Sequence, residues 1–327
     1  MVPYVPGEQP AGDKIVKLNT NENPYPPAPG VKKVLEELDT DRLRKYPDPA
    51  ATVLVKELAA YYGLGEDQVF VGVGSDDVLA MSFLTFFNSD KPVLFPDVTY
   101  SFYKVWADLF KVPFETPALK EDFTIDIKDY AKENGGVIFP NPNAPTGVYM
   151  PLEQIEEILI ANQDVVVIVD EAYVDFAGPS ALELVKKSNE NLLVVPDFQQ
   201  VSLHAGMRIG FAMGHPDLIR ALNNVKYSYN SYTMNLPSLL AGVEAVKDKA
   251  YFESTLAKIV ATRERSKKRL SELGFTFPDS RSNFIFASHE SVPAEKIFEA
   301  LKKEQIYVRY FKTPGLDNSL RISIGTD

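Results

Sequence analysis

The chain predicts an α/β fold, with a mostly parallel, doubly wound sheet in a large domain and a small α+β domain after it. The residues Val165–Val169 form an apolar, mostly β-branched run without alternation, which is typical of a strand covered on both faces. Similar runs alternate along the chain with helical segments, the order expected of parallel βαβ units. After Gly274 the pattern changes to short strands around one helix, and this change indicates the second domain.

Composition narrows the classes of function. A length of 327 residues is too great for one typical core, and 45% hydrophobic residues are ordinary for a globular protein. The 34 Lys and Arg against 45 Asp and Glu give a net charge of −11, which argues against nucleic acid and anionic membranes as partners. There is no cysteine, no signal peptide and no apolar run of membrane-spanning length, so we expect a cytoplasmic protein. With three scattered His we expect no metal site.

Three segments follow from this pattern. Residues 1–30 contain seven prolines and no helical period, so we expect an extended N-terminal arm that lies over the surface or over a partner subunit. Residues 31–245 are expected to form the large α/β domain, and residues 246–327 the small α+β domain. A helical pattern runs from about Ser238 to Leu273, across the expected boundary between the two domains, and predicts a long helical region there.

Candidate ligand-binding residues follow the predicted strands. Asp170 and Tyr173 come directly after the strand 165–169, at the end where open α/β sheets bind ligands. The segment Gly72–Asp76 predicts a glycine turn into a helix, where Ser75, Asp76 and free N–H groups would suit a phosphate. A plain strand-to-helix turn is the commoner outcome of such a segment. Tyr100, just past another strand, is placed either to stack on a planar ring or simply to pack against the sheet.

A set of motifs in fixed order resembles the pyridoxal-phosphate aminotransferases of fold type I, and among them most of all the histidinol-phosphate aminotransferases. The motifs are Asn19–Pro24, Tyr46–Pro49, Gly72–Asp76, Pro142–Gly147, Asp170–Tyr173, Ala205–Gly210 and Leu320–Ile322. The resemblance covers essentially the whole chain. It implies pyridoxal phosphate as cofactor and amino-group transfer in histidine biosynthesis.

The resemblance also implies roles for the cofactor-binding residues. Asp170 would face the pyridine nitrogen, Tyr173 would donate to the phenolic oxygen of the ring, and Tyr100 would stack on its face. Ser75, Asp76 and Arg208 would hold the phosphate. Asn143, in the proline-rich loop, is a further cofactor-binding candidate, and the next residue is Ala144, where many members carry an Asn.

Substrate and assembly are implied in the same way. Arg321 would hold an α-carboxylate, and Arg309 and Tyr4 are the candidates for the phosphate of the substrate. Tyr46 would reach the cofactor of the other subunit, which implies a homodimer. The expected substrates are a phosphorylated amine or amino acid and a 2-oxo acid.

The chain departs from the family at the lysine that carries the cofactor. Members have Ser-Lys before the Ala-Gly-x-Arg motif, with the Lys eight residues ahead of the Arg, where this chain has Gln199 and Gln200. Glutamine has no nucleophilic amine, so it forms no covalent link to the cofactor and moves no proton as a base. Transamination would then be deficient, with the cofactor bound non-covalently or not at all.

The unusual residues cluster between Asp197 and His204, which indicates a pocket rebuilt by nature or by engineering. One alternative is an ester hydrolase that uses Ser202 and His204, with Asp197 or Asp170 orienting the His. The alternative without a function is that Ser202 is an ordinary loop residue and His204 an ordinary packed or exposed histidine. Another alternative is a non-catalytic ligand binder. Because the chain stops after a strand where the family continues with a helix, we also expect the small domain to lack its last helix.

Overall fold

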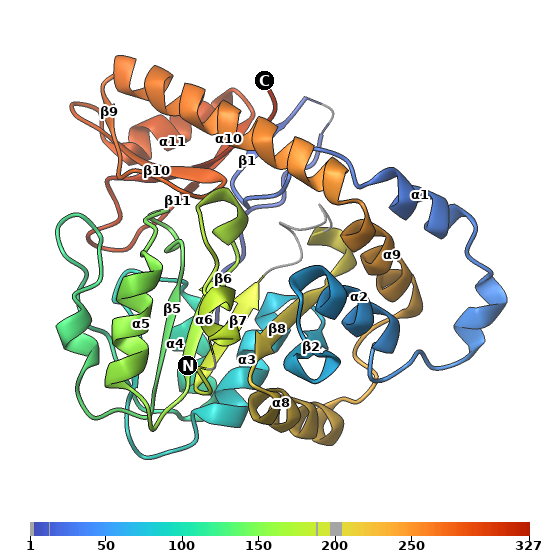
Figure 1. Cartoon of the computed structure of the whole chain (residues 1–327). Coiled ribbons are helices and arrows are strands. Elements are labelled where there is room, and N and C mark those ends of the chain that lie inside the picture. Colours follow the sequence, from blue (N-terminus) through green and yellow to red (C-terminus); the bar gives the residue numbers. More distant parts are fainter. Residues whose placement is uncertain (1–2, 13, 188, 197–204) are drawn as a thin grey trace.

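The computed structural model describes residues 3–12, 14–187, 189–196 and 205–327, which are organised around two sheets (Figure 1). The larger sheet has seven strands in the order β2-β8-β7-β6-β5-β3-β4. These are β2 (Val69–Gly72), β3 (Val93–Leu94), β4 (Phe114–Glu115), β5 (Gly136–Pro140), β6 (Val167–Glu171), β7 (Leu192–Pro196) and β8 (Gly210–Gly214). Strand β8 is antiparallel to both neighbours, and the other described pairs in this sheet are parallel.

Helices cover both faces of this sheet. The helices on one face are α2 (Thr52–Tyr62), α5 (Leu152–Ala161), α6 (Leu182–Lys186) and α9 (Leu236–Lys247), with α1 (Pro29–Glu36) packed on α9. The helices on the other face are α3 (Ser75–Phe86), α4 (Phe102–Phe110) and α8 (Pro216–Tyr229). Val167 and Val169 enter one core while Ile168 between them enters the other, because successive strand residues point to opposite faces. The expected mostly parallel, doubly wound sheet is confirmed.

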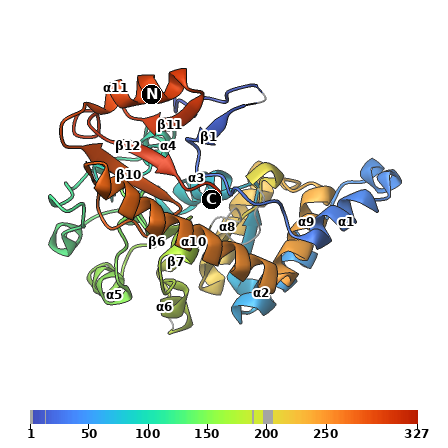
Figure 2. The same ribbon diagram turned by 90° about the horizontal axis from the view of Figure 1, so that it is seen from above.

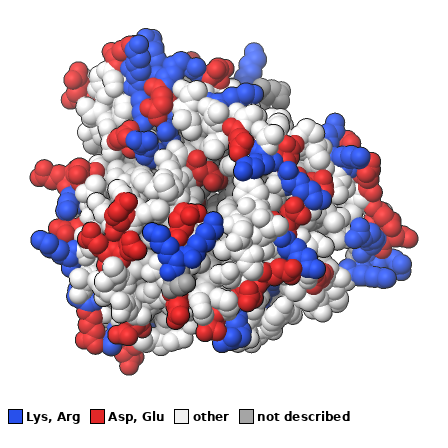
Figure 3. All heavy atoms as spheres, in the orientation of Figure 1, with Lys and Arg blue, Asp and Glu red and all other residues white. Residues whose placement is uncertain are grey.

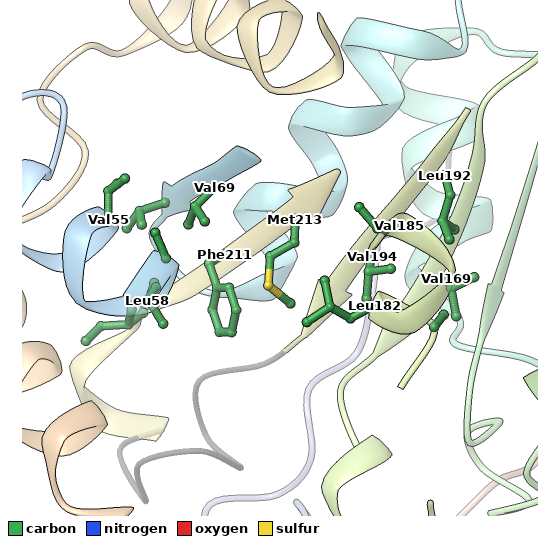
Figure 4. Packing of buried hydrophobic residues seen from close by; sticks show 14 of the residues in the cluster. Val55, Leu58, Val69, Val169, Leu182, Val185, Leu192, Val194, Phe211 and Met213 are labelled. Atoms are coloured by element: carbon green, nitrogen blue, oxygen red, sulfur yellow. The ribbon is translucent and has the colours of Figure 1, made fainter. Parts of the chain in front are cut away.

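The core under α2 and α6 shows how the centre of the sheet is buried. Phe211 and Met213 of β8 lie between Leu58 of α2 and Leu182 of α6 (Figure 4). All four side chains are at most 3% exposed. The closely packed core therefore fixes the position of the strands whose ends carry the polar candidate residues.

The smaller sheet has the order β1-β11-β12-β10-β9. Its strands are β1 (Val16–Leu18), β9 (Phe275–Thr276), β10 (Phe284–His289), β11 (Ile306–Tyr310) and β12 (Leu320–Ser323). Helices α10 (Lys249–Glu272) and α11 (Ala294–Lys303) pack on it through two small apolar clusters. This is the α+β architecture expected after residue 274; the domain boundaries at residues 30 and 245 stay predictions.

The N-terminal segment differs from a purely extended arm. Val16–Leu18 forms strand β1, which pairs in parallel with β11, with Val16 opposite Ile306 and Leu18 opposite Val308 (Figure 2). The sequence did not reveal strand β1, because a segment of three residues is too short to show the alternation typical of a strand. Its partner β11 also lies far away in the sequence. The small sheet is therefore built from both ends of the chain.

The expected long helix is divided at Asp248. Helix α9 ends at Lys247, and α10 begins at Lys249 and crosses from α9 toward β10 (Figure 2). The Asp248 carboxylate accepts a hydrogen bond from the Tyr251 N–H at 3.1 Å, which caps the start of α10. Short 3₁₀ segments complete the described elements, namely η1 (Thr40–Arg44), η2 (Glu66–Gln68), η3 (Ile127–Tyr130), η4 (Val174–Phe176) and η5 (Ala205–Met207).

Positive and negative side chains are interspersed over the face shown in Figure 3. Among the described residues, no helix combines the length and the apolar character that crossing a bilayer requires.

Candidate active site

A cavity of about 160 Å³ lies where the carboxyl ends of β5 and β6 meet the small sheet. Nine of the residues predicted from the sequence line it: Tyr4, Ser75, Asp76, Tyr100, Asp170, Tyr173, Arg208, Arg309 and Arg321. They come from both sheets and from the N-terminal segment, so only the folded chain brings them together.

The turn between β2 and α3 presents the N-terminus of a helix to this cavity. Gly74 has φ +87°, and a Cβ there would lie 2.5 Å from Arg208 Nη2. A Cβ on Gly210 would lie 2.2 Å from the carbonyl carbon of Gly74. Arg208, itself at φ +50°, is thus held close over the turn, and its Nη2 is 3.6 Å from Asp76 Oδ2. Helix N–H groups and a guanidinium are groups suited to holding an anion.

Asp170 is a buried carboxylate with organised donors. It is 4% exposed at the end of β6, and the Tyr103 hydroxyl donates to Oδ2 at 2.7 Å. The N–H of Ala172 donates to Oδ1 at 3.2 Å. Burial, with the neighbouring Asp170, raises the pKa of Tyr103 well above its ordinary value, so Tyr103 stays a donor.

Tyr100 is held by its hydroxyl as well as its ring. The hydroxyl donates to Asp76 Oδ1 at 2.7 Å, and the ring lies among Phe102, Tyr103 and Trp106 with centroids 5.5, 5.8 and 6.2 Å away. Burial and the nearby Asp76 raise its pKa well above the usual value. Tyr100 packs with the sheet-covering helix and also lines the cavity, so its stacking on a planar ring stays a prediction.

Asn21 also lines the cavity, and the sequence did not single it out as a site residue. Its Nδ2 donates to the Tyr173 hydroxyl at 2.9 Å, and its N–H donates to Ser323 Oγ at 2.9 Å. Asn21 has φ +58°, a left-handed conformation that Asn tolerates better than most residues. The only sequence signal is its place in the Asn19–Pro24 motif.

Two guanidinium groups from the small sheet line the cavity. Arg321 donates through Nη2 to the Asn19 carbonyl at 3.1 Å, and its Nε is buried without a hydrogen-bond partner among the described residues. Arg309 donates to the Val5 carbonyl at 3.0 Å. Within the described ranges neither arginine forms an ion pair, and burial lowers the pKa of Arg321 from its ordinary value. Such a pair would attract carboxylate or phosphate groups.

Two predicted residues do not line the cavity. Asn143 is buried and turns its Nδ2 to the Val98 carbonyl at 3.1 Å and to Thr146 Oγ1 at 3.0 Å, while its neighbour Ala144 lines the cavity. Tyr46 is 82% exposed and stacks on Tyr232 with the ring centroids 4.5 Å apart. Asp197, Gln199, Gln200, Ser202 and His204 lie outside the described residues.

Three further ionisable groups with shifted pKa values, Glu171, Asp175 and Lys226, do not line the cavity. Burial raises the pKa of Glu171 to about 8 and that of Asp175 to about 6. The Lys226 ammonium is buried, donates to the Val71 carbonyl at 3.2 Å and has its pKa lowered by burial. No group of three potential metal ligands occurs in the part of the chain that the structure describes.

Comparison with known proteins defines the class. The family model for aminotransferases of class I and II matches residues 13–327, and the chain belongs to this family. Its fold is that of the fold type I aminotransferases. Histidinol-phosphate aminotransferase from Clostridium acetobutylicum is 52% identical over 325 residues, which cover 99% of this chain and 92% of the relative. The enzyme of the same name from Brachyspira hyodysenteriae is 50% identical with the same coverage.

Solved structures agree on the fold. The chain resembles histidinol-phosphate aminotransferase from Sinorhizobium meliloti, solved in complex with pyridoxal-5′-phosphate, with a TM-score of 0.88 at 23% identity. That match covers 96% of this chain and 88% of the solved one. Another solved structure, also named as a histidinol-phosphate aminotransferase from Clostridium acetobutylicum, matches with a TM-score of 0.87 at 24% identity and so is not the 52% identical relative; the match covers 96% of this chain and 95% of the solved one.

Proposed function

We propose that this chain is a histidinol-phosphate aminotransferase, which uses pyridoxal phosphate to move an amino group between a phosphorylated amine or amino acid and a 2-oxo acid. The observation that carries the proposal is identity of about half of the residues, over nearly the whole chain, to enzymes of that name. The cavity supports it, since a helix N-terminus, a buried carboxylate and two arginines without an ion pair among the described residues line the same cavity.

The residues present fit the cofactor. Gly74 and Gly210 have no Cβ, and a Cβ at either position would collide with Arg208 or with the backbone of the β2–α3 turn. The turn can therefore keep the N-terminus of α3 and Arg208 close together, where a phosphate would bind both. The ring face of Tyr100 lines the same cavity as the Asp170 carboxylate, which a ring nitrogen would need at its edge. When bound, pyridoxal phosphate supplies an electron sink for the substrate's α-carbon.

The chain's own residues divide the remaining work. Asp170, fixed by Tyr103 and Ala172, would hold a proton on the pyridine nitrogen. Tyr173, positioned by Asn21, would donate to the phenolic oxygen. Arg321 would hold a carboxylate and Arg309 with Tyr4 a substrate phosphate. In a homodimer, the exposed Tyr46 would reach the partner's cofactor.

Gln200 conflicts with this function, because a glutamine replaces the lysine that should hold the cofactor and move the proton. The flanking segments are intact, since β7 pairs through Pro196 and Arg208 lines the cavity. A change limited to the stretch between Pro196 and Arg208 is what a local shift in the reading frame would produce.

The genetic code is consistent with such a shift. Gln199, Gln200 and Val201 are encoded as CAR-CAR-GTN, where R is a purine. Read from the second base of each codon, the same nucleotides give ARC and ARG, which encode Ser or Asn followed by Lys or Arg. The family's Ser-Lys pair therefore fits at positions 199 and 200, with its distance to Arg208 preserved. We propose that one nucleotide is inserted just before this stretch and one is lost just after it, so that Gln200 stands where the unshifted gene encodes Lys.

Nucleotide sequencing across these codons, together with peptide mass spectrometry of the protein from its native source, tests the frame. We expect a Ser-Lys peptide from the native source. Confirmed DNA and peptides that read Gln-Gln would contradict the shift and leave a cofactor binder as the function. The Ser202 and His204 hydrolase and the rebuilt pocket stay alternative predictions, because their residues lie outside the described ones.

The activity test compares the chain with Gln200, a Gln200→Lys variant and a chain carrying the unshifted stretch. General-base assistance is worth roughly 10²–10⁴ in rate, so the chain with Gln200 should transaminate histidinol phosphate at least that much more slowly than the unshifted chain. Gln200→Lys alone should recover covalent cofactor but only part of the rate, because its neighbours remain changed. Borohydride reduction and mass spectrometry locate the cofactor. Turnover at full rate with Gln200 in place, and cofactor on another lysine, would show that the lysine assignment is wrong.

A further inference from the structure

Lys226 carries a buried ammonium to which the proposed function gives no role. It lies on α8 and is 1% exposed. Burying a charged group costs free energy unless hydrogen bonds or opposite charges compensate it, and a methionine of similar length would fill the same space without that cost. The groups around the ammonium therefore indicate what its charge does.

The ammonium contacts the strand that leads into the β2–α3 turn. Its Nζ donates to the Val71 carbonyl of β2 at 3.2 Å and lies 5.4 Å from the centre of the Phe70 ring. A cation over an aromatic face is stabilised by the ring. Because α8 packs against both β2 and α3, Lys226 lies beside the two elements that flank the turn.

Two carboxylates favour the charged form of Lys226. Burial lowers the pKa of Lys226, while the charges of Asp77 on α3 and of Asp48 before α2 act in the opposite direction. Asp48 is exposed, and its two oxygens accept the N–H groups of Ala50 and Thr52 at 3.0 and 2.8 Å. Asp77 is the carboxylate that contacts the turn.

Asp77 supports the turn without lining the cavity. Its Oδ2 accepts the Val73 N–H at 3.0 Å, and a Cβ on Gly72 would lie 2.8 Å from the same oxygen. Ser75 and Asp76 line the cavity, whereas Asp77 and its contacts do not. The turn that would hold a phosphate is therefore fixed by contacts that the phosphate itself does not make.

We propose that Lys226 is a positioning residue for the phosphate of the cofactor. Its ammonium holds the end of β2 through Val71 and the start of α3 through Asp77, and so keeps the turn between them in the conformation that binds an anion. This role rests on the proposed binding of pyridoxal phosphate at the turn. Lys226 itself does not line the cavity, so it acts only through the turn.

Binding measurements on Lys226→Met test this role, with inorganic phosphate and pyridoxal phosphate as probes. Coupling between separate sites typically changes an affinity by roughly 5–150-fold, so we expect the variant to bind both probes at least about fivefold more weakly. The ³¹P chemical shift of bound pyridoxal phosphate should also change, because the donors around the phosphate are displaced. A lysine that only fills the core would leave this signal where it is.

Arg220→Met is the matched control. Arg220 lies on the same helix, 71% of its side chain is exposed, and it pairs with Asp217. The control removes the same charge from α8 and therefore measures the loss of long-range attraction for an anion. Because Arg220 does not contact the turn, the phosphate affinity and the ³¹P chemical shift should stay nearly unchanged.

Asp77→Asn separates positioning from simple electrostatics, and it also tests the role if Lys226→Met does not fold. The amide can still accept the Val73 N–H, but it no longer attracts the ammonium. Loss of a negative charge near an anion would by itself strengthen phosphate binding. Loss of support for the turn should instead weaken it, and Lys226→Met should have a smaller effect in the Asp77→Asn background than alone.

The outcomes separate this role from the proposed function. Equal phosphate affinities of Lys226→Met and Arg220→Met, or tighter phosphate binding by Asp77→Asn, would overturn the positioning role of Lys226 alone. Failure of the unsubstituted chain to bind either probe would instead remove the phosphate site of the proposed function, and this role with it.

Discussion

Replacing Tyr103 by Phe isolates the hydrogen bond that holds Asp170. The hydroxyl donates to Asp170 Oδ2 at 2.7 Å, and both residues are at most 4% exposed. A hydrogen bond to a charged group contributes about 1.5–3 kcal/mol, and a buried carboxylate that loses it has no water to replace the donor. We therefore expect Tyr103→Phe to lower the free energy of unfolding by about 2 kcal/mol.

The size of the thermal shift follows from the length of the chain. An unfolding entropy of roughly 2.1 cal/mol/K per residue over 327 residues gives about 0.7 kcal/mol/K, so a loss of 2 kcal/mol lowers Tm by about 3 °C. Differential scanning calorimetry of the cofactor-free protein measures it. The same variant should bind pyridoxal phosphate more weakly, because Asp170 is no longer fixed.

Tyr130→Phe is the matched control. Tyr130 is 1% exposed, and its hydroxyl has no hydrogen-bond partner among the described residues. Removing that hydroxyl should be neutral or slightly stabilising and should not change cofactor affinity. If Tyr103→Phe costs no more stability than Tyr130→Phe, the argument for a charge-assisted bond to Asp170 is wrong.

Three further predictions concern pH, backbone packing and assembly. Because burial raises the folded-state pKa of Glu171 from 4.5 to about 8, the folded protein binds the extra proton, and stability should fall as pH rises from about 4.5 to 8. Urea unfolding at pH 5.5 and 8 should show that Glu171→Gln reduces this fall; an unchanged pH dependence would exclude Glu171 as its source. Gly210→Ala should lower the free energy of unfolding by about 1–3 kcal/mol and weaken phosphate binding, because the new Cβ would lie 2.2 Å from the carbonyl carbon of Gly74. Gly206→Ala is the control, since a Cβ there would have no heavy atom within 4 Å and should change neither quantity. Equal effects of the two variants would refute the argument from close packing at Gly210. Light scattering should give 2 × 36.5 = 73.0 kDa, a dimer that covers the exposed Tyr46, and a mass of 36.5 kDa at micromolar concentration would count against it.

The local part of the fold could be predicted from the sequence. The apolar run before Asp170 identifies a covered strand, and strand ends in a parallel sheet gather at one edge, so Asp170 and Tyr173 were expected at a ligand site. The pairing of β1 with β11 was not accessible, because its register joins residues 16 and 306 through only three residue pairs. Its stabilisation depends on contacts that no short window of sequence contains.

The loop from Pro140 to Gly147 shows a different limit. Sequence placed a candidate amide at Asn143, but the structure turns that amide toward Val98 and Thr146 and leaves the methyl group of Ala144 at the cavity. An irregular loop has no period of two or 3.6 residues to decide which side chain points inward. Which of two neighbouring residues reaches a ligand depends there on the backbone path, and the path is known only from the structure.

Asn21 connects the two halves of the site. Its side chain holds the Tyr173 hydroxyl, its N–H donates to Ser323, and its carbonyl accepts from Asn283 Nδ2 at 2.9 Å. Ser323 follows Arg321 by two residues on β12, so both side chains leave the same face of that strand. A ligand that moves Arg321 therefore acts on the same strand that positions Asn21 and, through it, Tyr173. Asn21 thus links strand β12, which carries Arg321, to the Tyr173 hydroxyl just beyond strand β6.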